Sequence, residues 1–406
     1  MKRRSWIGVL LACALLTVTT AGAAEFDPAQ IAQGLQLHGF LSQGFLYSAE
    51  NNVYAKTTDG TFQFNEFGLN TSAELTDRLH AGIQLFSRDL GDFSNNTILL
   101  DWAYGDFHWN DKYAFRIGKI KIPLGFYNDS RDLDTARTPI FLPQSVYNES
   151  LRDSFQAVYG GEIYGIVPLK FVGQVAYQFQ LGESDIPLEG SLAEYLEAQH
   201  DFEILNISSG GHYASSLRWY PPIEGLRLGA SLMRFKIESD FQRPATSESD
   251  ETDQADEILP FTFDHVTIAV SSLEYMRGDW LFAAEFTTIA GDEETPEASS
   301  AMQEEGYFLS AAYQATDRLQ LGVYYAEFFP DVNDQEGQIP QSKGLPAHTN
   351  WQKEWVGTMC FEVNDFWNIK LEGHLINGTA LMLAQHNPDG LHENSWLLAL
   401  KTTFNF

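Results

Sequence analysis

The chain has 406 residues, 14% of them aromatic, with 55 Asp and Glu against 25 Lys and Arg and a formal net charge of −30. Such a negative chain is not expected to bind nucleic acid or an anionic surface nonspecifically. Its two cysteines, Cys13 and Cys360, are too few for a disulfide framework or a thiolate metal site, so we expect no metal and no cofactor. No segment reaches the roughly 18 uncharged apolar residues of a transmembrane helix.

Residues 1–24 have the pattern of an export signal. A basic start, Lys2-Arg3-Arg4, is followed by an apolar run over 6–18 and by small residues at 21–24. The run is too short to span a bilayer, so we expect a cleaved signal peptide rather than an anchor. Cleavage would leave 22 basic residues against 55 acidic ones and Cys360 as the single thiol.

Sixteen segments alternate apolar and polar residues, as expected of strands with one face in lipid and one in water. They lie at about 35–47, 61–75, 79–89, 97–109, 113–122, 155–166, 170–182, 211–220, 225–238, 261–277, 280–290, 305–316, 319–329, 351–363, 367–377 and 394–406. The last segment shows the pattern clearly, with Leu398, Leu400 and Phe404 on one face and Lys401 and Thr403 on the other. Its aromatic end also resembles the assembly signal of bacterial outer-membrane barrels.

Short and long connections alternate between these segments. Seven tight turns, at 76–78, 110–112, 167–169, 221–224, 278–279, 317–318 and 364–366, alternate with eight loops, at about 48–60, 90–96, 123–154, 183–210, 239–260, 291–304, 330–350 and 378–393. A β-sandwich with Greek-key links, the main alternative, gives no reason for this alternation. We therefore predict an all-β fold, a 16-stranded antiparallel up-and-down transmembrane β-barrel over 35–406, with a short segment at 25–34 ahead of it. Both termini and the tight turns would lie on the periplasmic side, and the long loops would be external.

Two compositional features fit a barrel in an outer membrane. Aromatic residues gather at the tight-turn ends, where they could form an interfacial girdle: Trp109, Tyr113, Phe171, Tyr220, Trp280, Tyr313, Phe361, Phe366 and Trp367. Acidic residues concentrate in the loops at 183–203, 238–257 and 291–305. We interpret them as a solvated surface, with divalent-cation bridges to neighbouring lipopolysaccharide as the functional alternative.

The loop at 123–154 is the main functional candidate, because structureless loops of this length usually have a function. It contains Phe141, Leu142, Val146 and Tyr147, which would be poorly placed in water. We therefore expect the loop to fold against another surface, either the inner wall of the barrel or a neighbouring subunit.

The sequence around this loop resembles a known family. Arg116-Ile117-Gly118-Lys119-Ile120-Lys121-Ile122-Pro123-Leu124-Gly125, followed by Arg131-Asp132, is similar to the fifth strand and third loop of phosphate-selective porins of Gram-negative bacteria. The resemblance covers about 115–165 and implies a third loop that folds inward and narrows the channel, and a homotrimer. One departure puts phosphate selectivity in doubt, because that family's selectivity depends on a dense set of arginines and lysines in the lumen and this chain has few.

Basic residues are nevertheless concentrated here, with acidic residues beside them. The predicted constriction and selectivity site comprises Arg116, Lys119, Lys121, Arg131, Asp132, Asp134, Arg137 and Arg152. Opposed charges at a narrow point would orient polar solutes by a transverse field. The alternative is a set of salt bridges that tie the loop down, each worth about 0–1 kcal/mol at a surface. Because screening acts over about 8 Å at physiological salt, local charges rather than the net charge would set the selectivity.

The alternation also predicts which of these residues face the lumen. With Phe115 and Ile117 outward, Arg116 points inward. Lys119 and Lys121 then fall on the outward parity near the external rim, unless a bulge turns them in.

The predicted function is that of an outer-membrane porin, a passive diffusion channel for small polar or ionic solutes. The partners we expect are membrane lipid, lipopolysaccharide and the solutes. The alternatives are a substrate-specific anion or organic-acid channel, a barrel that sheathes a partner protein, and an outer-membrane hydrolase. We predict no enzyme and no catalytic residue, since the common hydrolase and metalloprotease motifs are missing from the sequence. For a hydrolase, Ser42 near His38, or His80, could be proposed, but lone histidines in a lumen are more often ordinary polar wall residues.

Overall fold

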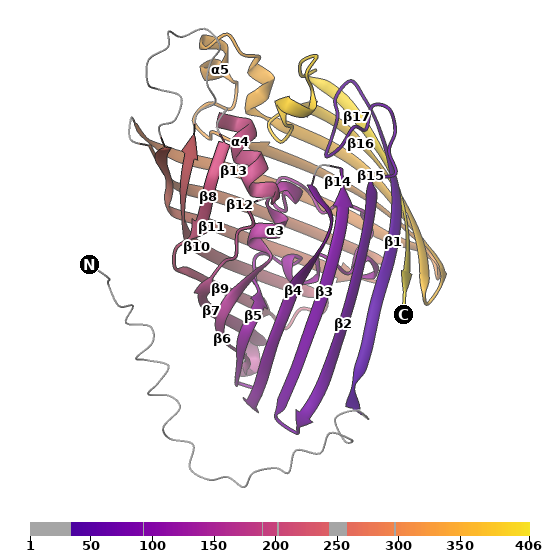
Figure 1. The fold of residues 1–406 in the computed structure, drawn as a ribbon. Coiled ribbons are helices and arrows are strands. Elements are labelled where there is room, and N and C mark those ends of the chain that lie inside the picture. Colours follow the sequence, from indigo (N-terminus) through magenta and orange to yellow (C-terminus); the bar gives the residue numbers. More distant parts are fainter. Residues whose placement is uncertain (1–33, 92, 189, 201–202, 243–257, 296–297) are drawn as a thin grey trace, which may run out of the picture.

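The computed structural model describes residues 34–406, except 92, 189, 201–202, 243–257 and 296–297. The predicted export signal, nearly all of the segment 25–34 and much of one acidic loop lie outside the described residues. The described chain forms one antiparallel sheet that closes on itself where β1 pairs with β17 (Figure 1). Closure pairs the first strand with the last, so neither is left as a free edge of the sheet.

The wall strands follow the chain in order around the barrel. They are β1 (Gln36–Ala49), β2 (Phe64–Thr76), β3 (Leu79–Leu90), β4 (Phe93–Asn110), β5 (Tyr113–Lys121), β6 (Ala157–Pro168), β7 (Gln174–Glu183), β8 (Glu203–Ser209), β9 (His212–Tyr220), β10 (Leu226–Gln242), β11 (Ile258–Arg277), β12 (Trp280–Glu294), β13 (Ser299–Thr316), β14 (Leu319–Phe329), β15 (Gln352–Asn364), β16 (Trp367–Gly378) and β17 (Asn394–Asn405). Both β8 and β9 pair with β10, at successive positions along it. They form one wall strand interrupted at Gly210 and Gly211, so these segments build the 16-stranded barrel that the alternation predicts.

The connections contain only short helices in the part of the chain that the structure describes. They are η1 (Asn128–Ser130), η2 (Asp134–Ala136), η3 (Glu149–Leu151), α3 (Arg152–Phe155), η4 (Lys170–Val172), α4 (Ser191–His200), α5 (Gln338–Ser342), η5 (Ala347–Asn350) and η6 (Ala384–His386). None of the described helices has the length and apolar character needed to cross a membrane. Neither α4 nor β8 was expected within the predicted loop 183–210.

The outer face of the barrel is apolar, as the period-2 pattern predicts. In β17, Leu398 and Leu400 are 39% and 44% exposed, whereas Leu397, Ala399 and Lys401 on the other parity are at most 1% exposed. The same contrast recurs around the wall, with exposed outward side chains such as Ile117, Leu309, Trp355 and Leu375. A closed wall with apolar side chains on its outer face is suited to contact with hydrocarbon.

The interior is largely filled by the chain itself. One apolar cluster joins α4 to the inner faces of β10 and β11, where Leu196 packs near Phe235 and Phe261. A second contains Phe64 of β2 and Phe141 of the segment 123–154, whose rings stack with centroids 5.2 Å apart. The long loop therefore folds against the inner wall of the barrel, one of the two surfaces that its apolar residues predict.

Candidate functional site

The segment 123–154 crosses the interior of the barrel and bonds to strands far apart on the wall. The Gly125 amide donates to Ser231 Oγ on β10 at 2.8 Å, and Ser145 Oγ donates to the Tyr307 carbonyl on β13 at 3.0 Å. The Ile140 amide donates to Glu372 Oε2 on β16 at 2.6 Å. Because β10 and β16 lie in different parts of the circumference, the segment spans the interior rather than lying along one side.

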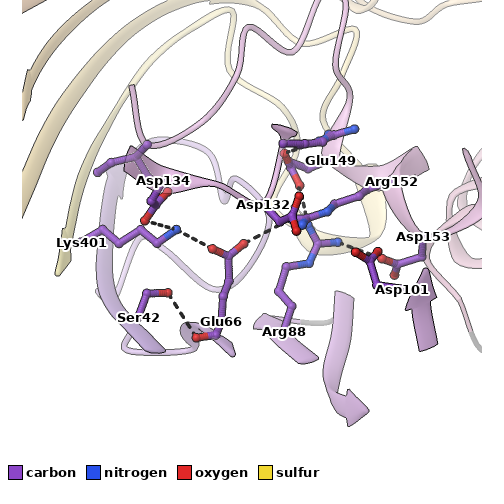
Figure 2. Close-up of polar contacts among 12 residues, drawn as sticks. Ser42, Glu66, Arg88, Asp101, Asp132, Asp134, Glu149, Arg152, Asp153 and Lys401 are labelled. Atoms are coloured by element: carbon purple, nitrogen blue, oxygen red, sulfur yellow. Dashed lines mark hydrogen bonds and ion pairs between the residues drawn. The ribbon is translucent and has the colours of Figure 1, made fainter. Parts of the chain in front are cut away.

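One end of the segment is held by a carboxylate surrounded by guanidinium groups. Glu149 pairs with Arg131 at 2.9 Å. It also pairs with Arg88 of β3, and Arg152 lies 3.9 Å from it (Figure 2). All four side chains are at most 6% exposed. Burial alone would raise the pKa of Glu149, but Arg131, Arg88 and Arg152 outweigh it and hold that pKa well below its usual range.

The middle of the segment is held by a second carboxylate, Asp134, among basic groups from the last two strands. Its Oδ2 atom lies 2.9 Å from Lys401 Nζ and accepts from Thr403 Oγ1 at 2.5 Å. Lys370 Nζ lies 3.8 Å from Oδ1 and donates to the Asp134 carbonyl at 2.6 Å. Burial would raise the pKa of Asp134, but Lys401, Lys370 and Arg137 lower it further than burial raises it.

The two carboxylates belong to one buried network, because Glu66 of β2 connects them. Lys401 Nζ lies 2.5 Å from Glu66 Oε2, and Arg152 Nη1 lies 3.2 Å from Glu66 Oε1 (Figure 2). The network runs from Asp134 through Lys401, Glu66 and Arg152 to Glu149. A loop whose Asp134 and Glu149 are both bonded to wall residues is fixed in position rather than free in the lumen.

A polar cavity of about 320 Å³ lies beside this network, between the segment and the wall strands β2 to β7. It is lined by Asn70, Gln84, Trp102, Tyr104, Arg116, Ile120, Lys121, Asp129, Asp132, Leu133 and Gln178. Lys121 Nζ lies 2.5 Å from Asp132 Oδ1, and Arg116 bonds to Asp106 and Glu162 at 2.9 and 3.1 Å. Paired basic and acidic groups thus line a space open to water-sized molecules.

The structure divides the predicted site residues into two sets. Arg116, Lys121 and Asp132 line the polar cavity. Lys121 therefore reaches the interior despite its outward parity, and its ammonium contacts Asp132 and the Asp129 carbonyl of the loop. Lys119 does not line the cavity. It donates to the Leu100 carbonyl at 2.7 Å, and its ammonium lies 5.1 Å from the Tyr159 ring centroid.

The remaining predicted residues are committed to contacts within the protein. Arg131, Asp134 and Arg152 are buried in the ion pairs described above. Arg137 donates to the carbonyl oxygens of Pro139 and Ile140 at 3.3 and 2.9 Å. These contacts match the alternative interpretation, in which the charged residues hold the loop against the wall. Four predicted residues have this position: Arg131, Asp134, Arg137 and Arg152.

Sequence reasoning missed the residues of the wall that receive the loop. They are Glu66, Arg88, Glu285, Lys370, Glu372 and Lys401. Each is a charged residue on the inward-facing parity of a strand. That pattern was the sequence signal that could have identified them. Ser42 of the hydrolase alternative donates to the Glu66 carbonyl at 3.4 Å, and no cluster of three or more metal-ligating side chains occurs in the described part of the chain.

No protein-family model and no curated protein matches this chain. Solved structures do match it, at low sequence identity. OmpF of Salmonella typhi, in complex with daunomycin, has a TM-score of 0.57 and 12% identity, over 92% of this chain and 97% of that one. OprB of Pseudomonas putida has a TM-score of 0.57 and 11% identity, over 93% and 96%. An anion-selective porin from Comamonas acidovorans has a TM-score of 0.54 and 12% identity, over 92% and 99%.

The likeness is one of fold. It supports a porin-like barrel for this chain and does not single out the phosphate-selective type. At such identities the solutes of the matched proteins do not transfer to this chain.

The turn that carries the chain from β5 into the barrel gives a first prediction. Gly125 has φ +60°, and a Cβ there would lie 2.1 Å from Tyr147 Oη, which donates to Glu285 at 2.5 Å. We expect Gly125→Ala to destabilise the barrel by about 1–3 kcal/mol, because a left-handed backbone and a displaced hydrogen bond both cost free energy. Denaturant unfolding measures this loss. Gly357→Ala is the matched control, since a Cβ at Gly357 has open space, and equal stability of the two variants would contradict the prediction.

Proposed function

We propose that this protein is a porin of the outer membrane, a passive diffusion channel for small polar or ionic solutes whose lumen is narrowed by the segment 123–154. The observation that carries the proposal is the position of this segment. It is fixed by buried ion pairs across a closed barrel and lies beside a cavity with opposed charges. Catalysis has no comparable support, because Ser42 is bonded to a backbone carbonyl.

Several further features support an outer-membrane location. The wall has an apolar outer face, the fold is porin-like, and residues 1–24 have the pattern of a cleaved signal peptide. Trp109, Phe171 and Phe366 near the tight turns are 64%, 93% and 65% exposed, as an interfacial girdle requires. We propose that the protein is a homotrimer in contact with membrane lipid and lipopolysaccharide.

The barrel-sheath alternative has less support than a channel. A sheath needs an interior wide enough for a segment of its partner. Here Phe141 and Tyr147 of the chain's own loop, together with α4, occupy that space. A substrate-specific anion or organic-acid channel remains the alternative, with Arg116 and Lys121 as the groups that would attract an anion.

Planar-bilayer recording of the purified, refolded protein tests the channel. We expect discrete conductance steps that are small for a 16-stranded porin, because the loop and the apolar clusters fill much of the interior. Protein that inserts as a folded barrel but gives no steps above the lipid background would overturn the proposal. A trimer is checked independently by the mass of the detergent-extracted complex.

Two variants on β5 form a matched pair that tests where ion selectivity arises. Lys121 lines the polar cavity, whereas Lys119 contacts Tyr159 and does not line it. We expect Lys121→Gln to shift the reversal potential toward cations, since it removes a positive charge that lies beside Asp132 within a Debye length of the solute path. Lys119→Gln should leave the reversal potential near that of the wild type. Equal shifts in the two variants would show that this cavity does not set selectivity.

A further inference from the structure

A second cavity, separate from the polar one, lies near the external ends of the strands. It has a volume of about 130 Å³ and is bounded by the segment 123–154, α4 and the strands β10 to β13. Its walls are mainly apolar and include Leu124, Phe155, Leu196, Phe235 and Ile268. None of the residues on which the proposed ion selectivity depends, Arg116 or Lys121, lines it.

The size and lining of this cavity limit what it can hold. Interior cavities of this kind are uncommon, because protein interiors are packed as densely as organic crystals. An apolar cavity of about 150 Å³ lined by Leu, Ile and Phe stays dry and binds benzene. The cavity here is close to that size, so its walls suit a single aromatic ring rather than a hydrated ion or a sugar.

One carboxyl group in the lining could fix the orientation of a ligand bound in the cavity. Glu304 of β13 is on the inward parity and lines the cavity. Across the residues that the structure describes, nothing donates a hydrogen bond to its carboxylate and no basic side chain pairs with it. Arg131 also lines the cavity, but its guanidinium is bonded to Glu149 and to the Tyr147 carbonyl. Glu304 is therefore a carboxyl group without a hydrogen-bond partner beside an apolar surface. Its charged form is costly there unless a ligand supplies an opposite charge.

We propose that this cavity is a binding site for a small organic cation, a single aromatic ring that carries a protonated amine. The ring occupies the apolar space between α4 and β10 to β13, and the ammonium group pairs with Glu304. The site adds a class of solute to the proposed function. Binding at the site does not depend on that function, but a role of the site in transport does.

Calorimetric titration of the full-length protein in lipid nanodiscs tests the site, with benzylamine as the probe. Nanodiscs are preferred because detergent tails could occupy an apolar cavity. We expect benzylamine to bind at least tenfold more tightly than benzoate, which carries the wrong charge, and than methylamine, which has no ring. Equal affinity for benzylamine and benzoate, or no binding of benzylamine, would overturn the proposal without any variant being made.

Variants then test the assignment of the carboxylate. Glu304→Gln should weaken benzylamine binding at least tenfold. Glu305→Gln, a change of the same chemistry on the next residue of β13, should leave it within twofold, because Glu305 is on the opposite parity and bonds to Gln335. If both variants bind like the wild type, the charge is not the determinant and the proposal fails. A protein that conducts but does not bind benzylamine refutes this site alone, whereas one that binds but does not conduct refutes the channel.

Discussion

Glu149→Gln is expected to lower the free energy of unfolding by about 3–5 kcal/mol, the usual loss when one partner of a buried ion pair is removed. The carboxylate lies among Arg88, Arg131 and Arg152, which are at most 5% exposed. Figure 2 shows Arg88 and Arg152 beside it. A neutral amide keeps one accepting oxygen but no charge, so Arg131 would lose its carboxylate partner and keep only neutral acceptors such as the Tyr147 carbonyl. It would also leave Arg88 with only Asp153, at 3.5 Å.

Denaturant unfolding of the barrel in lipid vesicles, followed by tryptophan fluorescence, measures this loss. Glu362→Gln is the control, because Glu362 is exposed near the tight turn after β15 and surface changes usually stay within about 0.5 kcal/mol. A loss for Glu149→Gln no larger than that of the control would show that the guanidinium groups do not depend on this carboxylate.

Acid should weaken the same anchor. The pKa of Glu149 lies below its usual range in the folded protein, because the three guanidinium groups outweigh the effect of burial. A carboxyl with a lowered pKa stabilises the fold above its unfolded value of about 4.3 and loses that contribution as the pH falls toward the folded value. Unfolding of the wild type between pH 6 and pH 2 should therefore show stability falling below pH 4, with a shallower fall in Glu149→Gln.

The strands were predictable because the two faces of a porin-like wall contact different surroundings. In β17 that difference is visible residue by residue, with Leu398 and Leu400 outside and Lys401 and Thr403 inside. The interrupted strand was the exception. Gly210 and Gly211 break the alternation between β8 and β9, so the sequence predicts a strand only after them.

The contacts of the loop were not predictable in the same way. Parity places Lys370 and Lys401 on the inner face, but it does not say which loop residue meets them. Lys370 bonds to Asp134 across 236 positions of the chain, and no local pattern records such a pairing. The same limit applies to Arg131 and Arg152, since a sequence cannot show whether a basic side chain faces water or a buried carboxylate.

Asp134→Asn is expected to change conduction as well as stability. Asp134 forms an ion pair with Lys401 and accepts a hydrogen bond from Thr403, both on β17, and Lys370 of β16 lies 3.8 Å from it. Lys370 is fully buried, so without this carboxylate its charge is left with backbone carbonyls alone, at a cost on the order of 3 kcal/mol. The middle of the segment should then leave the wall more often.

Single-channel recording separates this effect from a general loss of stability. The variant should show a larger mean conductance and more frequent transitions than the wild type, since the segment that narrows the lumen is less firmly held. The double variant Asp134→Leu, Lys370→Met also removes the buried ammonium of Lys370, while Lys401 keeps Glu66 as its partner. It should recover part of the lost unfolding free energy, because apolar replacements of a buried ion pair are often neutral. If Asp134→Asn unfolds more easily but conducts like the wild type, the segment stabilises the barrel without controlling the pore.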